Sequence, residues 1–137
     1  MEPAASQLPG VRETQPPIPP RWRTLWAFSR PHTVIGTSLS LVGLFAIIVL
    51  RQPTASAISR HGLALLAATW LAALAANVYI VGLNQLTDIA LDRINKPDLP
   101  LASGALSRRE ALRLVTLSAV LALGLGLLLG PWLLATL

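Results

Sequence analysis

The sequence of 137 residues contains no cysteine, and only 12% of its residues are charged. The absence of cysteine excludes disulfide bonds, thiolate metal sites and a cysteine nucleophile. The low charge excludes an ordinary soluble domain, which needs more charged side chains to cover its surface. Because 53% of the residues are hydrophobic, the composition indicates an integral membrane protein.

Acidic residues are scarce as well, six against eleven basic ones. A basic chain raises the question of a nucleic acid partner, but no basic face with stacking aromatic residues is present. The basic residues instead flank apolar segments, which is typical of signals for membrane orientation. We therefore expect no nucleic acid partner.

Three long apolar runs predict transmembrane helices at about 33–50, 62–86 and 110–130. Each is close to the ~20 residues that cross about 30 Å of hydrocarbon. Pro31 suits the first turn of the first span, and Gly130 followed by Pro131 marks a break after the third. Since no alternating strand pattern competes, the predicted fold class is all-α with three spans, within a transmembrane domain over 33–137.

The segments before the first span are different in character. Residues 1–20 are rich in proline and have no apolar period, so we expect a disordered arm. Residues 21–32 carry Trp22 and Trp26 four apart among arginines, which predicts an interfacial segment at the level of the lipid headgroups.

Basic residues concentrate on two of the connections. Nine lie in the N-terminal arm and in or just after the 87–110 loop, namely Arg12, Arg21, Arg23, Arg30, Arg93, Lys96, Arg108, Arg109 and Arg113. Only Arg51 and Arg60 lie in the connection between the first two spans. The excess predicts that the arm and the 87–110 loop face the cytoplasm.

Polar residues recur along the end of the second span. Asn84, Asp88 and Asp92 are spaced by four, Asn77 comes seven before Asn84, and Gln85 lies beside it. A continuing helix stacks the residues spaced by four on one face. Because polar groups that face lipid are costly, this stripe predicts a functional site, with Asn77 and Gln85 as candidate substrate contacts.

Two carboxylates one helical turn apart suit Mg²⁺, which takes one or two carboxylates and leaves positions for phosphate oxygens. We expect a diphosphate headgroup at this helix end, with Arg93 and Lys96 neutralising its charge. The alternative is that Asp88 and Asp92 are solvated loop acids paired with Arg93 and Lys96.

Two further groups carry predictions. Ser107 and Glu110 fit a capping box at the start of the third span. Arg30, at the start of the first span, is a candidate contact for a substrate carboxylate, with a lipid headgroup as the alternative partner.

The segment NQLTDIALD, residues 84–92, resembles the first aspartate-rich motif, NQxxDxxxD, of the UbiA-type aromatic prenyltransferases. The segments INKPDLPLASG (94–104) and FSRPHTVIGT (28–37) are similar to the branch of that family that acts on homogentisate in tocopherol and plastoquinone synthesis. Chlorophyll synthases share the first motif and are the second-ranked resemblance.

The resemblance implies a ring of about nine transmembrane helices around a cavity open to lipid. It implies that Asn84, Asp88 and Asp92 hold Mg²⁺ and the prenyl diphosphate, with Arg93 and Lys96 as diphosphate partners. The implied reaction transfers a phytyl group to homogentisate with decarboxylation, and solanesyl or geranylgeranyl donors are the alternatives. The implied location is a thylakoid or plasma membrane of an oxygenic phototroph, with the basic loops cytoplasmic or stromal.

Members of the family carry a second aspartate-rich motif, whereas no acidic residue follows Glu110 here. We therefore expect the chain to be the N-terminal part of a longer protein or a truncated product, completed by a C-terminal half or a partner chain. The alternatives are an inactive fragment that still binds Mg²⁺ or diphosphate, and a small membrane scaffold whose polar stripe pairs with partner helices.

Overall fold

The structure, a computed structural model, describes residues 19–51 and 58–130. The predicted arm over residues 1–20 lies almost wholly outside the described residues, as does the segment after Gly130. Five helices are present: α1 (Arg21–Phe28), α2 (Pro31–Arg51), α3 (Arg60–Thr87), α4 (Ile89–Asn95) and α5 (Arg108–Leu129). The described ranges contain no strand, and the predicted all-α class is confirmed.

Three of these helices, α2, α3 and α5, are long and apolar enough to cross a membrane. Their ends lie within two residues of the limits predicted for the three spans. The chain is therefore a multi-pass membrane protein. The short α1 occupies the segment that was predicted to lie at the membrane interface.

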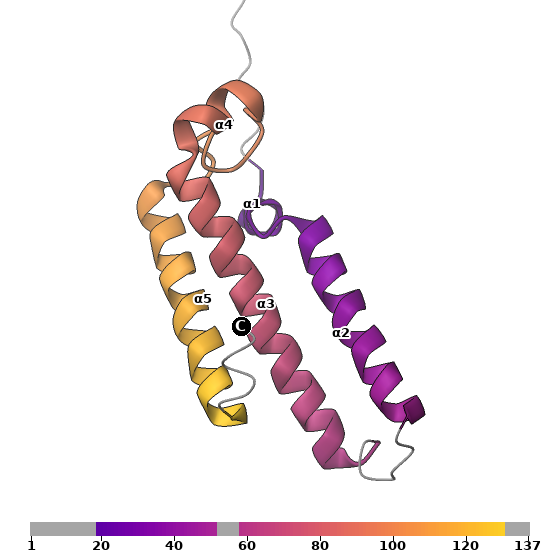
Figure 1. Cartoon of the computed structure of the whole chain (residues 1–137). Helices are drawn as coiled ribbons and strands as arrows, with labels where there is room; N and C mark the ends of the chain where they lie inside the picture. Colours follow the sequence, from indigo (N-terminus) through magenta and orange to yellow (C-terminus); the bar gives the residue numbers. More distant parts are fainter. Residues whose placement is uncertain (1–18, 52–57, 131–137) are drawn as a thin grey trace, which may run out of the picture.

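Helix α3 lies between the other two long helices, with α5 along one side and α2 along the other (Figure 1). Small residues are buried where α3 and α5 meet, and these are Ala72, Ala75, Gly82, Ala111, Ala122 and Gly126. Small side chains allow two membrane helices to approach closely and gain dispersion energy. The α3–α5 pair is accordingly the main packed unit of the described chain.

Helix α2 is attached to α3 in a different way, because α2 buries none of its own residues. Two hydrogen bonds connect the helices instead. Asn77 Nδ2 donates to Thr33 Oγ1 at 3.1 Å, and Trp70 Nε1 donates to Ser38 Oγ at 3.0 Å. Hydrogen bonds of this kind contribute about 0.6 kcal/mol each between membrane helices.

A compact apolar cluster sits at the end of the molecule where α3 finishes and α5 begins. It contains Phe28, Leu101, Leu106, Ala111 and Val115. The loop after α4 thus folds back onto α1 and α5, which fixes the carboxyl end of α3 among several elements.

The predicted capping box is confirmed at the start of α5. Ser107 Oγ accepts a hydrogen bond from the Glu110 peptide N–H at 3.2 Å, and the Ser107 peptide N–H donates to Glu110 Oε2 at 3.1 Å. Arg21 reaches the same carboxylate, with its Nη2 atom 2.7 Å from Glu110 Oε1. The amino end of α1 is therefore tied to the first turn of α5.

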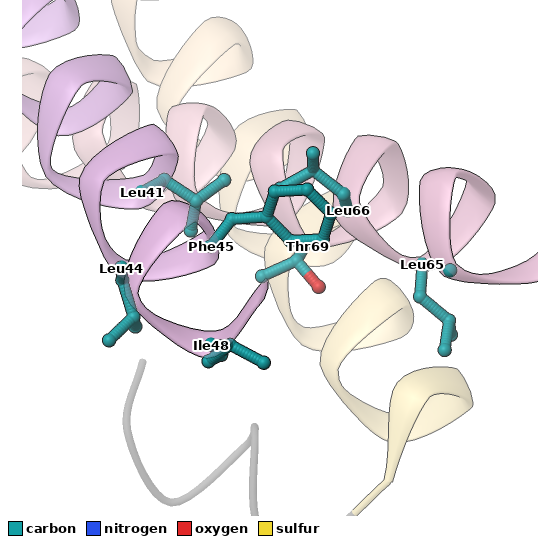
Figure 2. Close-up of a pocket in the computed structure, with 8 residues that line it drawn as sticks. Leu41, Leu44, Phe45, Ile48, Leu65, Leu66 and Thr69 are labelled. Carbon is teal, nitrogen blue, oxygen red and sulfur yellow. The ribbon is translucent and has the colours of Figure 1, made fainter. Parts of the chain in front are cut away.

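At the other end of the bundle, α2 and α3 line an open apolar pocket of about 280 Å³ (Figure 2). Its lining residues are Leu41, Leu44, Phe45, Ile48, Gly62, Leu65, Leu66 and Thr69. Along a straight helix, Thr69 is roughly 28 Å from Asp88. The pocket is therefore separate from the polar end of α3.

Candidate functional site

The polar motif spans a break in the helix rather than one continuous helix. Helix α3 ends at Thr87, Asp88 adopts φ −102° and ψ 16°, and α4 begins at Ile89. The stacking on one face that a continuing helix gives is therefore interrupted at Asp88. In Figure 1 the turns of α4 lie at the end of α3, out of line with its axis.

Hydrogen bonds between residues four apart nevertheless continue across the break. The Asp88 peptide N–H donates to the Asn84 carbonyl at 3.0 Å, and that of Asp92 donates to the Asp88 carbonyl at 2.8 Å. The Lys96 peptide N–H donates in turn to the Asp92 carbonyl at 2.7 Å. The motif thus keeps its spacing of one turn while changing direction.

The three motif side chains differ in exposure. Asn84 and Asp88 are exposed, whereas Asp92 is only 6% exposed. Lys96 lies four residues on, with its Nζ atom 3.8 Å from Asp92 Oδ1. Burial of a carboxylate is costly without a compensating cation, and Lys96 places a positive charge beside Asp92.

The alternative to a ligand site was that Asp88 and Asp92 pair with Arg93 and Lys96. The ion pair between Asp92 and Lys96 agrees with this alternative for one of the two acids. Asp88 does not follow it, because the ion pairs of the described ranges include none between Asp88 and Arg93. Asp88 and Arg93 are both exposed and stay available to a ligand. The site therefore offers one buried, paired carboxylate and one open carboxylate.

Arg30 occupies the turn between α1 and α2 and has a left-handed backbone, with φ 52°. Such a conformation costs energy for a residue that has a Cβ atom. Hydrogen bonds hold it on both sides, since the Arg30 peptide N–H donates to the Ala27 carbonyl at 3.2 Å and the Arg30 carbonyl accepts from Thr33 Oγ1 at 2.8 Å. The position of the Arg30 turn is therefore well defined.

The two candidate substrate contacts on α3 make interactions within the chain. Asn77 donates to Thr33 on α2, as described above. Gln85 is 1% exposed, and its Nε2 atom donates to the Phe28 carbonyl at 2.9 Å and to the Val81 carbonyl at 3.3 Å. Both amides thus connect α3 with the segments before and after Arg30.

The donor set fits Mg²⁺ only together with a phosphate ligand. Among the described residues, no group of three or more His, Cys, Asp and Glu side chains gathers into a metal site. Asp88, Asp92 and the amide oxygen of Asn84 offer two carboxylates and one neutral oxygen. Mg²⁺ is commonly held by one or two carboxylates plus substrate phosphates, so this set matches a shared protein–diphosphate site.

Comparison with known proteins assigns the chain to a family. Residues 32–137 match the model of the UbiA prenyltransferase family, and the chain belongs to that family. No solved structure matches the chain.

Named relatives agree with this assignment. Homogentisate phytyltransferase of Synechocystis sp. is 47% identical over 111 residues, which are 81% of this chain and 36% of that protein. Homogentisate phytyltransferase 1 of Arabidopsis thaliana is 43% identical over 78% of this chain and 26% of its own length. Homogentisate geranylgeranyltransferase of Hordeum vulgare is 37% identical over 77% of this chain and 25% of its own. The chain therefore spans between a quarter and somewhat over a third of the length of these relatives.

The sequence patterns did not identify three residues that shape the site. Thr33 receives the Asn77 amide, the Phe28 carbonyl receives the Gln85 amide, and Gly82 allows Phe28 and Val115 to approach α3. A glycine inside a predicted helix, two residues before the polar motif, was the available signal for Gly82. No sequence signal marks a backbone carbonyl as a partner.

Proposed function

We propose that the polypeptide carrying this sequence transfers a prenyl group, phytyl in the first instance, from prenyl diphosphate to homogentisate in tocopherol synthesis. The observation that carries the proposal is the NQLTDIALD motif at the carboxyl end of a membrane helix, with Asp88 open and Asp92 paired to Lys96. Relatives named as homogentisate phytyltransferases, 43% and 47% identical, support the same reaction.

In this proposal Asn84, Asp88 and Asp92 hold Mg²⁺ against the diphosphate. The bound ion supplies positive charge that stabilises the diphosphate as it leaves. Lys96 is the ion-pair partner of Asp92, and the exposed Arg93 is free to contact phosphate oxygens. The end of a membrane helix suits a substrate with a charged head and an apolar tail, since the tail lies in lipid or against apolar side chains.

The reaction balances as follows. The bond between the prenyl carbon and the diphosphate oxygen breaks, and the electron pair leaves with diphosphate. The ring carbon of homogentisate bonds to the resulting allylic cation and loses a proton. The side-chain carboxylate departs as carbon dioxide, and the carbon that carried it gains a proton. Arg30 is the proposed contact for that carboxylate before it departs.

The proposed orientation places the N-terminal side and the 87–110 loop on the cytoplasmic or stromal side of a thylakoid or plasma membrane. Both basic connections then lie on one side, where the positive-inside rule places them. Helix α1 would lie at the membrane interface on that side, since its exposed Trp22 and Trp26 are typical of either interface.

Other prenyl donors form the second candidate. Homogentisate geranylgeranyltransferase of Hordeum vulgare and homogentisate solanesyltransferase of Arabidopsis thaliana are 37% and 38% identical to the chain. These identities are lower than those of the two phytyltransferases above, which favours phytyl diphosphate as the donor.

The proposal is tested by incubating membranes that contain the polypeptide with labelled homogentisate and phytyl diphosphate. We expect a decarboxylated, prenylated quinol that forms with Mg²⁺ and not after chelation with EDTA. Parallel reactions with geranylgeranyl and solanesyl diphosphate identify the preferred donor. Absence of product with all three donors, despite folded protein in the membrane, would favour the two alternatives, an inactive fragment or a membrane scaffold. Loss of Mg²⁺-dependent diphosphate binding in Asp88→Asn would then indicate the fragment, and unchanged binding would indicate the scaffold.

A further inference from the structure

One buried amide fastens α1 to the end of α3. The two hydrogen bonds of Gln85 both run from Nε2 to carbonyl oxygens, those of Phe28 and Val81. Because a carbonyl oxygen only accepts, the nitrogen of the amide must face these partners, and its orientation is fixed. Gln85 Oε1 has no partner among the described residues. The donor side of the amide is therefore what holds the side chain in place.

This bond connects the two segments to which the proposed function assigns the two substrates. Phe28 is the last residue of α1 and comes two residues before Arg30, the proposed carboxylate contact. Gln85 directly follows Asn84, which belongs to the diphosphate site. The Gln85 side chain thus links the turn proposed to contact homogentisate with the helix end proposed to bind the prenyl diphosphate.

Packing reinforces the connection at Phe28. Phe28 as a whole is 1% exposed, and its ring lies so close to α3 that a Cβ atom at Gly82 would be 2.8 Å from its Cζ atom. Both the side chain and the carbonyl of Phe28 are therefore held by α3. At the far end of α1, the ion pair between Arg21 and Glu110 holds the helix to α5.

We propose that Gln85 is a positioning residue, rather than a substrate contact, and that it sets the spacing between the Arg30 turn and the Asn84–Asp88 end of α3. This inference rests on the proposed function. Joining two substrates requires the reacting atoms to approach within about 3–3.5 Å, and a misplacement of 1 Å costs about 10²-fold in rate. Cleavage of the diphosphate does not depend on the Arg30 turn, whereas formation of the new carbon–carbon bond needs the Arg30 turn and the end of α3 at the correct distance from each other.

The test is the substitution Gln85→Leu, which replaces the amide side chain with an apolar one of similar size. Membranes with each variant receive phytyl diphosphate, homogentisate and Mg²⁺, and three quantities are measured: diphosphate released, phytol formed by water, and prenylated quinol. We expect prenylated quinol per diphosphate released to fall about 10- to 100-fold while the Mg²⁺ concentration for half-maximal cleavage stays the same.

The matched control is Trp70→Phe, which removes the hydrogen bond from Trp70 to Ser38 and leaves α1 untouched. We expect its ratio of quinol to diphosphate to equal that of the wild type. Amide hydrogen exchange gives a readout that does not depend on activity. The peptide N–H groups of Ser29 and Arg30 should exchange faster in Gln85→Leu and at the wild-type rate in Trp70→Phe.

Two results would overturn the inference. A raised requirement for Mg²⁺ or phytyl diphosphate with an unchanged product ratio would make Gln85 a direct ligand. Equal loss of cleavage and transfer, in proportion to the folded protein that remains, would leave only a general structural role. If the wild type forms no quinol, the proposed function itself is overturned. This outcome is distinguishable from the two above, because in both of them the wild type forms quinol.

Discussion

Gly82 of α3 is closely packed against Phe28 and Val115, and this packing gives a quantitative prediction. A Cβ atom placed there would lie 2.6 Å from Val115 Cγ2 and 2.8 Å from Phe28 Cζ. Non-bonded carbon atoms rest about 3.5–4.0 Å apart, so Gly82→Ala forces each neighbour to move by about 1 Å. Overpacking of this kind costs about 1–3 kcal/mol.

The sign of the net effect depends on an opposing term. Replacing glycine by alanine inside a helix stabilises it by about 0.8–1 kcal/mol. We therefore expect Gly82→Ala to lower the free energy of unfolding by roughly 0–2 kcal/mol. The matched control is Gly124→Ala in α5, where the added Cβ would meet no described atom within 4 Å apart from its chain neighbours and the nearby backbone of its own helix. The control should gain stability, so the two variants should differ by about 1–3 kcal/mol.

Unfolding of the purified variants in the same detergent, followed by circular dichroism against denaturant, measures this difference. Hydrogen exchange at Phe28 and Ser29 locates the disturbance at the end of α1. If Gly82→Ala were as stable as Gly124→Ala, the packing of Phe28 and Val115 against α3 would be refuted, and with it the anchoring of α1.

Three further substitutions test other contacts of the fold. Ser107→Ala removes the N-cap of α5 and should lower the free energy of unfolding by about 1 kcal/mol. Ser107→Asn should keep a stability close to that of the wild type, because asparagine is also a good N-cap. Equal stability of the two variants would count against the capping box. Arg21→Gln removes an exposed ion pair, and thermal unfolding should show a smaller loss than for Ser107→Ala, because such pairs are weak in water. Asn77→Leu removes the hydrogen bond to Thr33 and should cost about 0.6 kcal/mol, measured by unfolding in detergent; a loss of several kcal/mol would mean that Asn77 has partners beyond Thr33.

The sequence was a good guide to the long helices because their length and apolar character are local properties. The limits of α2, α3 and α5 follow from where the apolar runs stop, and the start of α5 follows from the local pairing of Ser107 with Glu110. The family assignment also rests on a local pattern, the NQLTDIALD segment.

The arrangement around the site could not be predicted in the same way, because it depends on residues far apart in the chain. A spacing of four indicates which residues share a face only while the helix continues, and the break at Asp88 ends that inference. Asp92 is therefore buried while Asn84 and Asp88 are exposed. The role of Gln85 depends on the Phe28 carbonyl, 57 residues earlier, and no periodic pattern contains that information.

The surface of α2 is exposed within the described chain. Its apolar side chains have no buried position among the described residues, and in a membrane they face lipid or other helices. The polar contacts at Thr33 and Ser38 fix its position against α3 without a large packed interface. The pairing of α2 with α3 should therefore be weaker than that of α5 with α3.

The most direct test of the central claim compares the three aspartates of the motif and the loop that follows it. Asp88→Asn and Asp92→Asn each remove a carboxylate proposed to hold Mg²⁺, and Asp98→Asn removes an exposed carboxylate outside the motif. In the transfer of a phytyl group to labelled homogentisate, we predict a loss of about 10²-fold or more for the first two and wild-type activity for Asp98→Asn. Full activity of Asp88→Asn and Asp92→Asn would contradict the account.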